Sequence, residues 1–504
     1  MDWFPLCNYT HYSLQRGFSK PNELAKKCSE NFYSACGIAD YKSISGAISF
    51  YQACLANNIK PIIGCSFDGF SLFAKNKDGW FNLIELVSSI DNDGKIDSSM
   101  LLSITKLGNL ISVAPNESSS PIKGKNFYKK SESFTDVYYT NKEDAGLHRI
   151  MLCSSMKTTL PKISKAIKKG EEVKNHTFFE SNDFYLKDKT EIGEVIINDN
   201  RLKDFKEIYD ECENYNILSQ PNLPKFETPD GQTQKDHLRT LARKGWTDLL
   251  SDKITDPEEK KVYGDRFRQE FEVIEGAKLF GYFLIVRDII NYATGQGWMV
   301  GPGRGSAAGC LISYLIGITQ IDPIEYDLIF ERFYNAGRNT EDHISLPDID
   351  IDVPGGKRDE IISYLKQKYG NDNVSQMITF GRLQGRSALK EVLRVNNACG
   401  FSEITKSIPD EASISDQLAE MDEEDRSIIR WSLLNNADEL RDYCFINSEN
   451  ELDGDYAEYF RQAISIEGTF KTQGKHAAGV VISAEDLYKV CPMVNPKSGT
   501  EKIA

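Results

Sequence analysis

PDIDIDV, residues 347–353, is the stretch that most constrains the fold, because aspartate alternates in it with isoleucine or valine. In a β-strand, side chains two residues apart share a face, so Asp348, Asp350 and Asp352 are predicted to line one side. The apolar residues between them would then anchor the other side in a core. A row of carboxylates repels itself and is relieved by protonation or by metal, so the motif predicts a cation site. An edge strand with a solvated acidic face explains the motif equally well on its own.

The expected cofactor of this strand is Mg²⁺, in two ions. Carboxylate oxygens are hard ligands that suit Mg²⁺, and two such ions can hold the attacking and leaving oxygens of a phosphoryl group in line. On this interpretation Asp348 and Asp350 are the metal ligands, and Asp352 is a neighbour on the same face that ranks below them.

A second informative stretch, GPGRGSAAG at residues 301–309, precedes the apolar run CLISYLIG. Glycines let backbone N–H groups approach phosphate oxygens, Ser306 can donate or cap, and the following helix is expected to direct its positive end at an anion. The loop is not a Walker A loop, since no Lys-Ser/Thr pair follows its last glycine. Gly303, Gly305 and Ala308 fit a dinucleotide fingerprint weakly, because only a short strand precedes them, and a plain tight turn is the simpler alternative.

The net charge and the local charge give opposite indications about nucleic-acid binding. The net charge of −15 opposes binding to a phosphate backbone, which relies on lysine and arginine. Residues 355–394, however, contain eight basic residues against four acidic ones, directly after the carboxylate row. A solvated helix face is the commoner meaning of such a count, but a duplex could also rest there. The order of phosphate loop, carboxylates and basic segment is that of an enzyme that binds a triphosphate and a polyanion.

Composition and length indicate a soluble protein of two to four domains. The chain has 504 residues, 40% of them hydrophobic, with no apolar run long enough to cross a bilayer and no leader-like start. A cytoplasmic protein with no membrane partner is therefore expected. The eleven cysteines form no CxxC pair, which argues against a zinc ribbon or a disulfide framework.

The order of apolar runs indicates how the chain is organised. A β/α rhythm up to residue 67 predicts parallel strands with covering helices. The segment QPNLPKFETPDGQTQ marks a domain boundary near Ser219.

Six ordered segments give the chain a specific resemblance to the bacterial replicative C-family polymerases, the family of the DNA polymerase III alpha subunit. The resemblance is weak up to Glu213 and strong from Leu223 onward. It implies an α/β and α+β multidomain fold: a β/α barrel like the polymerase and histidinol phosphatase (PHP) domain at 1–213, a polymerase-beta-like nucleotidyltransferase palm with a mixed sheet at 214–380 and 456–504, and a helical thumb at 381–455. The segments are GYFLIVRDII, GPGRGSAAG, ITQIDPIEYDLIFERF, LPDIDIDV, QMITFG and GKHAAGVVIS.

The resemblance also implies roles for individual residues. Asp348 and Asp350 fall on the first two catalytic aspartates of the family, and Gly305 and Ser306 fall on its triphosphate-binding pair. The implied reaction is attack of a primer 3′-hydroxyl on a deoxynucleoside triphosphate, directed by primer-template DNA. Further nucleotide-binding residues are expected at Arg304, Arg332, Lys475 and His476, and DNA-phosphate contacts at Arg386, Lys390 and Arg394, which are spaced to share one helix face.

The amino-terminal region departs from the family's metal cluster. Where the family has histidines and a glutamate, this chain has other residues, and of the cluster only Asp40 remains. One carboxylate cannot hold a metal cluster, so a structural domain without exonuclease activity is predicted. His148 is expected to serve packing. The departures are Cys7, Tyr9, Tyr41 and Ser66.

The third catalytic aspartate of the family is expected beyond Ala504. We therefore expect either a truncated sequence or a polymerase divided between two polypeptides, as in a phage with an interrupted gene, and the split enzyme is the favoured hypothesis. A carboxy-terminal polymerase chain would complete the site and connect it to a sliding clamp and a proofreading subunit. A catalytically inactive, polymerase-derived protein that binds DNA or the replisome is the alternative. A dehydrogenase-type enzyme is not favoured, because it does not explain the aspartate row and because no βαβ unit continues from the strand before the glycine loop.

Overall fold

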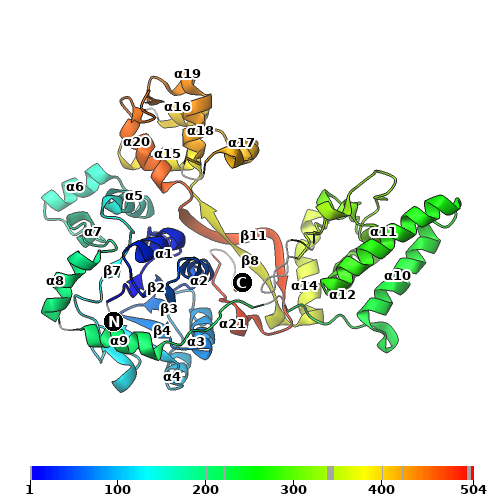
Figure 1. Ribbon diagram of the computed structural model, residues 1–504, viewed down its shortest axis with the longest axis horizontal. Helices are drawn as coiled ribbons and strands as arrows, with labels where there is room; N and C mark the ends of the chain where they lie inside the picture. The colour runs from blue at the N-terminus through cyan, green and yellow to red at the C-terminus, as the bar shows by residue number, and fades with distance from the viewer. Residues whose placement is uncertain are drawn as a thin grey trace. The chain divides into compact units, whose positions relative to one another are not determined.

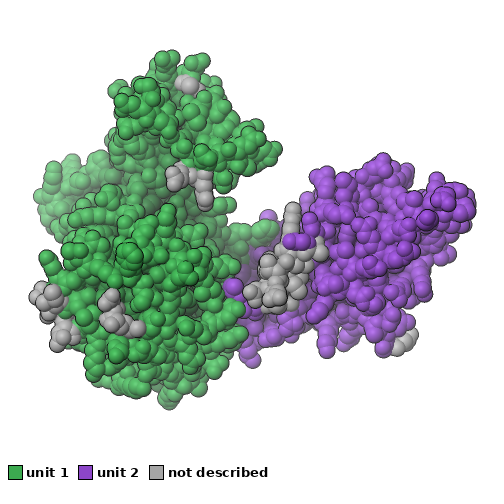
Figure 2. Space-filling view, viewed as in Figure 1, with its two compact units in different colours: residues 1–217, 378–476, 491–503 green, residues 218–377, 477–490, 504 purple. Residues whose placement is uncertain are grey.

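The computed structural model describes residues 3–199, 201–219, 222–335, 337, 346–399, 401–422, 425–496 and 501–504. The chain forms two compact units (Figure 2). Unit 1 contains Met1–Ile217, Ile378–His476 and Cys491–Ile503, and unit 2 contains Leu218–Met377, Ala477–Val490 and Ala504. Two residues of the linker expected from the sequence, 220 and 221, lie outside the described residues.

A five-stranded sheet organises the amino-terminal part of unit 1 (Figure 1). The helix α2 connects its first two strands, which are parallel, as the β/α rhythm predicts. The next two pairings are antiparallel and the last is parallel, so the sheet is mixed. The order is β2 (Ala35–Tyr41), β3 (Lys60–Phe67), β4 (Phe70–Ala74), β5 (Leu110–Ala114) and β6 (Phe127–Lys129).

A second, two-stranded sheet lies beside the first strand of this sheet. In it β1 (Cys7–Asn8) pairs in parallel with β7 (Asp136–Val137). The amide of Gly37, on β2, donates to the carbonyl oxygen of Pro5 at 2.8 Å, so the chain entering β1 runs next to β2. The helices of this part are α1 (Pro21–Glu30), α2 (Ala47–Ala56), α3 (Lys77–Ser88), α4 (Ser98–Thr105), α5 (Ala145–Ser155), α6 (Leu160–Lys168), α7 (Thr177–Glu180), α8 (Lys189–Asp199) and α9 (Leu202–Glu211).

Short helices gather around α15 (Gly385–Val395) at the end of β8 in the remainder of unit 1 (Figure 1). Val392 and Leu393 of α15 are fully buried and share one core with Phe460 of α20 and Met151 of α5. The alternation of buried and exposed positions at helical spacing therefore fixes α15 at the centre of this group. The other elements are α16 (Phe401–Ile404), α17 (Ser415–Glu420), α18 (Ile428–Asn435), α19 (Ala437–Leu440), α20 (Ala457–Ile466), β9 (Phe445–Ile446) and β10 (Leu452–Asp453).

Unit 2 is built mainly from helices, around a large apolar core and a smaller apolar cluster that contains Ile361 and Leu365 of α14. Its α10 and α13 pack closely because Gly245 has no side chain: a Cβ there would lie 1.7 Å from the carbonyl oxygen of Leu315. The helix α11 begins at Pro257, and the carboxylate of its N-cap Asp256 accepts from the amide of Glu259 at 3.1 Å. The helices are α10 (Gln234–Leu249), α11 (Pro257–Gly276), α12 (Phe280–Gly295), α13 (Leu311–Leu315), α14 (Arg358–Tyr369) and α21 (Leu487–Val490).

Two long paired strands, β8 (Val374–Arg382) and β11 (Phe470–Ile482), continue from one unit into the other. Residues 374–377 and 477–482 of these strands belong to unit 2, and the remainder belongs to unit 1. None of the described helices is both long enough and apolar enough to cross a bilayer.

Candidate functional site

The aspartate row lies on an extended segment of unit 2. Ile349, Ile351 and Val353 pack against the apolar core of the unit, while Asp348 and Asp352 are exposed and Asp350 is partly buried. The predicted alternation of faces is therefore confirmed. The predicted strand is wrong, because residues 347–353 form no ladder with a neighbouring strand. A single backbone contact, from the amide of Gly301 to the carbonyl oxygen of Asp352 at 2.9 Å, ties the segment to the glycine loop.

The glycine loop exposes its tip and buries its end. Arg304, Gly305 and Ser306 are exposed, whereas residues 307–309 are buried. Gly303 has a φ of +101°, and a Cβ there would lie 2.8 Å from Cγ2 of Thr319, so only glycine fits this close turn. Gly305 also has a positive φ, of +63°, and opens the short 3₁₀ helix Gly305–Gly309. The loop therefore exposes Arg304, Gly305 and Ser306 at its tip.

Arg304 joins the loop to the aspartate row. Its Nη1 lies 2.6 Å from Oδ2 of Asp350, and its Nε donates to Oδ1 of Asp352 at 3.2 Å. The structure thus brings together the two stretches that the sequence singled out. Asp350 and Asp352 also lie on the same side of their segment, because one guanidinium reaches both.

Tyr282, on α12, is a neighbour of the aspartate row that the sequence pattern did not single out. Its hydroxyl donates to the carbonyl oxygen of Pro347 at 2.6 Å, which fixes the start of the aspartate segment. Burial raises the pKa of Tyr282 to about 12, and the negative charges of Asp348 and Asp350 add to the shift. Tyr282 therefore remains a neutral hydrogen-bond donor at neutral pH.

The helix after the loop, α13, does not direct its amino terminus at an external anion, so this prediction is wrong. The carboxylate of Glu270 accepts from the amides of Leu311 at 3.0 Å and Ile312 at 2.9 Å. Glu270 is fully buried and pairs with Nε of Arg266 at 2.7 Å. An internal carboxylate thus satisfies the positive end of the helix. Only the exposed tip of the loop remains to contact a phosphate.

The sequence pattern also did not single out Glu270, whose carboxylate holds the end of the glycine loop in place. It lies on α11 among Tyr263, Phe271 and Ile274, which are buried at helical spacing. A charged residue inside such an apolar stripe is the signal that could have identified it, since a buried carboxylate requires a partner.

The segment that carries Arg332 packs against the same loop. Nη2 of Arg266 donates to the carbonyl oxygens of Gly309 at 2.7 Å and Leu328 at 3.0 Å, which joins the two backbones. The following 3₁₀ helix, Phe330–Arg332, buries Phe330 in the core and leaves Arg332 exposed. The predicted contact of Arg332 with a triphosphate stays a prediction.

The remaining predicted site residues belong to unit 1. Lys475 and His476 are exposed on β11, and their part in nucleotide binding stays a prediction. On α15, Nε of Arg386 donates to the carbonyl oxygen of Ile408 at 2.9 Å. Arg394 donates to Glu391, whereas Lys390 is exposed. Arg386 and Arg394, two of the three residues expected to contact DNA, are therefore already hydrogen-bonded to other groups of the protein.

The expected location of the family's amino-terminal metal cluster contains a lysine-carboxylate pair. Nζ of Lys130 donates to both carboxylate oxygens of Asp136, at 2.7 and 2.6 Å, and the Tyr9 hydroxyl lies 3.1 Å from that of Ser66. Burial raises the pKa of the Cys7 thiol to about 12. Among the described residues, no group of three or more histidine, cysteine, aspartate or glutamate side chains is placed to hold a metal ion.

Asp40, the retained cluster residue, is fully buried and accepts hydrogen bonds from the backbone amide and the hydroxyl of Thr10, both at 2.7 Å, and from the hydroxyl of Ser13 at 2.5 Å. Burial raises its pKa to about 6, and these hydrogen bonds oppose the shift. Asp40 therefore fixes the loop after β1. His148 is also buried, and its Nε2 donates to the carbonyl oxygen of Arg16 at 2.5 Å, as expected for a packing residue.

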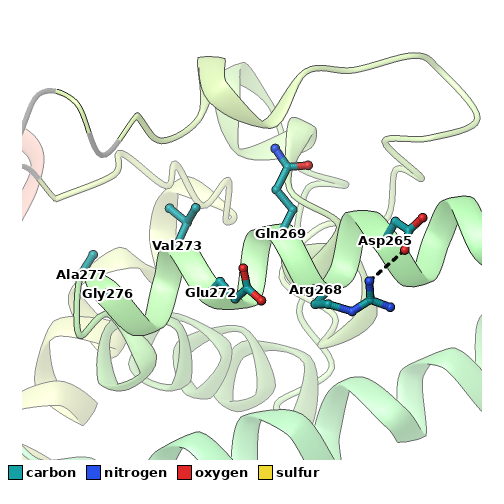
Figure 3. Close-up of a pocket in the computed structure, with 7 residues that line it drawn as sticks. All are labelled: Asp265, Arg268, Gln269, Glu272, Val273, Gly276 and Ala277. Atoms are coloured by element: carbon teal, nitrogen blue, oxygen red, sulfur yellow. Dashed lines mark hydrogen bonds and ion pairs between the residues drawn. The ribbon is translucent and has the colours of Figure 1, made fainter.

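A surface hollow of about 670 Å³ follows α11 (Figure 3). Its lining residues all come from one stretch of the chain, 265–277, and include the ion pair of Arg268 with Asp265 at 3.0 Å. Because no second element converges on it, the hollow lacks the polar groups from several directions that mark a ligand site.

Comparisons with known proteins cover nearly the whole chain. The family model "PHP domain" matches residues 6–214, and the family model "Bacterial DNA polymerase III alpha NTPase domain" matches residues 236–504. The DNA polymerase III subunit alpha of Bacillus subtilis (strain 168) is 30% identical over 99% of this chain and 46% of the relative. The corresponding protein of Staphylococcus aureus (strain Mu50 / ATCC 700699) is 30% identical over 97% of this chain and 44% of the relative. The chain therefore spans less than half the length of these relatives.

Proposed function

Because the chain belongs to the bacterial DNA polymerase III alpha family, we propose that it forms part of a template-directed DNA polymerase that extends a primer by two-metal phosphoryl transfer. The observation that carries the proposal is the contact of Arg304 with Asp350 at 2.6 Å, which places the glycine loop beside the aspartate row. Phosphate-binding and metal-binding groups must be adjacent for this chemistry, because the metal ions coordinate the phosphoryl oxygens.

The aspartate row fits Mg²⁺. Its ligand atoms are carboxylate oxygens, which Mg²⁺ prefers, and a cationic guanidinium already bridges two of the carboxylates. No third histidine, cysteine, aspartate or glutamate converges with them among the described residues. Mg²⁺ accepts this arrangement, since it is usually bound by one or two carboxylates together with water and substrate phosphates. Asp348 and Asp350 would hold the two ions.

In the proposed reaction the primer 3′-hydroxyl attacks the α-phosphate of a deoxynucleoside triphosphate, and pyrophosphate leaves. The two Mg²⁺ ions, when bound, supply charge neutralisation and alignment of the reacting oxygens. The residues of the chain act mainly by positioning. Gly305 and Ser306 bind the β- and γ-phosphates through their amide and hydroxyl groups, with Arg304 and Arg332 as cationic partners. Lys475 and His476 are further proposed nucleotide-binding residues.

The finer domain assignment belongs to the same proposal. Residues 1–213 form a PHP-like barrel with a degenerate metal site, and residues 214–380 and 456–504 form the palm. Residues 381–455 form the thumb, from which Lys390 contacts the phosphates of primer-template DNA, whereas Arg386 and Arg394 hold the carbonyl oxygen of Ile408 and the carboxylate of Glu391. Since the relatives are bacterial proteins, we place the polymerase in the bacterial cytoplasm or nucleoid.

Further polypeptide is part of the proposal, because the relatives are more than twice as long as this chain. A carboxy-terminal polymerase chain would add the third catalytic aspartate and the contacts to a sliding clamp and a proofreading subunit. Primer extension should be measured with this chain alone, with a carboxy-terminal polymerase polypeptide alone and with both. We expect extension only from the mixture, and full activity of this chain alone would refute the requirement for a partner.

The aspartate assignment is tested in the active mixture. Asp350→Asn should abolish primer extension, because it removes a metal ligand, and circular dichroism should show an intact fold. Asp265→Asn is the matched control, since Asp265 is an exposed carboxylate of the same unit that pairs with Arg268. Retained extension by Asp350→Asn would exclude the proposed catalytic site. It would favour the alternative of a polymerase-derived protein that binds DNA or the replisome and has no catalytic role of its own.

A further inference from the structure

We propose that Arg304 is an exchangeable counter-ion of the aspartate row: it occupies Asp350 and Asp352 before metal binds, and metal binding releases it to the triphosphate. The inference rests on the proposed function and extends it by assigning a second position to one residue. It starts from the two contacts of the guanidinium, at 2.6 Å to Asp350 and 3.2 Å to Asp352.

The carboxylate row favours a positive charge beside it. Asp348, Asp350 and Asp352 occupy alternate positions of one extended segment, and the charges of the first two contribute to the raised pKa of the nearby Tyr282. Like charges at this spacing repel unless a cation lies between them. The guanidinium of Arg304 supplies that cation in the structure.

Arg304 uses an atom that a metal ion would also need. Its Nη1 contacts Oδ2 of Asp350, which is one of the two oxygens of a proposed metal ligand. A divalent cation on this oxygen would also repel the guanidinium at close range. Arg304 and the metal ion therefore compete for Asp350 and are not bound there together.

Because Arg304 and Asp350 are exposed, separating them costs little free energy. The side chains of Arg304 and Asp350 are 56% and 39% exposed. Ion pairs in such surroundings contribute little stability, because water solvates the separated groups well. The other arginine-carboxylate pair at this loop, Arg266 with Glu270, shows the opposite arrangement, since Glu270 is fully buried and also holds two backbone amides. The buried pair holds the loop in place, and the exposed pair is free to exchange.

The released guanidinium has a second partner within reach. Arg304 directly precedes the exposed Gly305 and Ser306, where the triphosphate is proposed to bind. The planar guanidinium group makes paired hydrogen bonds to phosphate as readily as to carboxylate. A metal-bound triphosphate would therefore bring both the cation that displaces Arg304 and the anion that receives it.

The proposal predicts effects of opposite sign on metal and on triphosphate. Mn²⁺ binding to the full chain, followed by electron paramagnetic resonance without nucleotide, should become about fivefold tighter in Arg304→Met, the size expected for an exposed ion pair. The gain should disappear in the Asp350→Asn background. Arg268→Met is the matched control, because Arg268 is an exposed arginine of the same unit that pairs with Asp265 instead. It should leave Mn²⁺ affinity unchanged.

Binding of dTTP with Ca²⁺ provides the second readout. It should weaken about tenfold in Arg304→Met, since one charge-assisted contact is lost, and Arg304→Lys should recover part of the loss. If Arg304 had a merely structural role, its substitution would weaken the binding of both Mn²⁺ and dTTP. Weaker or unchanged Mn²⁺ binding in Arg304→Met would overturn the proposal. If Asp350→Asn still lowers Mn²⁺ affinity, only this inference fails, whereas Mn²⁺ binding that is absent or independent of Asp350 removes the proposed metal site as well.

Discussion

Glu270 on α11 accepts a hydrogen bond from the backbone amide of Ile312 at 2.9 Å, and so caps the amino terminus of α13 from another part of the chain. Its burial raises the pKa of this carboxyl, while the amides of Ile312 and Leu311 and the charge of Arg266 oppose the shift. The same carboxylate therefore satisfies a helix end and an arginine that braces the glycine loop.

Glu270→Ala is expected to destabilise the protein strongly. It leaves Arg266 without its carboxylate and two buried amides without an acceptor, and breaking such a buried pair costs about 3–5 kcal/mol. Urea unfolding of the full chain, followed by circular dichroism, measures the loss. Glu272→Ala on the exposed face of the same helix is the control and should change stability by less than about 0.5 kcal/mol. Equal stability of the two variants would contradict the bracing role.

The aspartate segment shows that periodicity can predict which side chains face the core but not whether the segment pairs as a strand. Alternation at residues 347–353 correctly identified Ile349, Ile351 and Val353 as the side that packs on the core. It also predicted a strand, and this was wrong. A strand requires a partner with free backbone groups, and the side-chain pattern of one segment contains no information about that partner.

Long-range contacts account for the rest of what the sequence did not show. Glu270 precedes Leu311 by 41 residues, and the Tyr9 hydroxyl meets that of Ser66 across a separation of 57 residues. Arg304 was predicted as a nucleotide-binding residue from its place in the glycine loop, but its contact with Asp350 depends on how two loops meet. Such pairings follow from tertiary packing, whereas local spacing predicts only which residues share a face.

Stability should fall below neutral pH because His148 is buried in its neutral form. Burial lowers its pKa to about 4, and the charge of Arg149 acts in the same direction. The unfolded chain, with an ordinary histidine pKa of about 6.5, binds more protons between these values, so stability is lost as pH falls from 6.5 towards 4. From pH 7 to pH 5 the loss from His148 is about 2 kcal/mol.

His148→Gln should remove this part of the pH dependence, since glutamine keeps a donor for the carbonyl oxygen of Arg16 and does not titrate. Urea unfolding at pH 7 and pH 5 tests it. His11, whose pKa burial lowers to about 3, should preserve some dependence in the variant. The half-buried His176 serves as control for the substitution, and His176→Gln should keep the difference in stability between pH 7 and pH 5. An unchanged pH slope in His148→Gln would show that His148 is not the titrating group.

Lys130→Met should destabilise unit 1, because it leaves Asp136 without its cation in a largely buried position. The expected cost is about 1–3 kcal/mol, and Asp136→Asn added to Lys130→Met should recover part of it. Lys129→Met, at the exposed end of β6 directly before Lys130, is the control for loss of one positive charge. Thermal unfolding followed by circular dichroism is the measurement, and a melting temperature unaffected by Lys130→Met would refute the role of the ion pair.

Lys390 and Arg394 should respond differently to loss of charge. Lys390→Gln is expected to weaken binding of primer-template DNA and to lower its salt dependence by about one ion, because an exposed phosphate contact is lost. Arg394→Gln should instead reduce stability by about 1–2 kcal/mol, since Glu391 would keep only Lys471 as a charged partner. Fluorescence anisotropy at several salt concentrations and urea unfolding separate the two effects. Arg394→Gln with normal stability and weaker DNA binding would reverse the assignment.

Cys399 should be the cysteine that reacts first in the folded protein. It is exposed and Cys491 is half-buried, whereas the other nine cysteines are buried. Burial raises the pKa of the Cys153 and Cys444 thiols to about 12, so their reactive thiolate forms are scarce at neutral pH. Maleimide labelling followed by peptide mass spectrometry should therefore find one fast adduct, at Cys399, and Cys399→Ser should remove it. In urea all eleven thiols should react. Fast labelling of Cys7 in the native protein would contradict the buried β1 strand, on which the geometry around Asp136 depends.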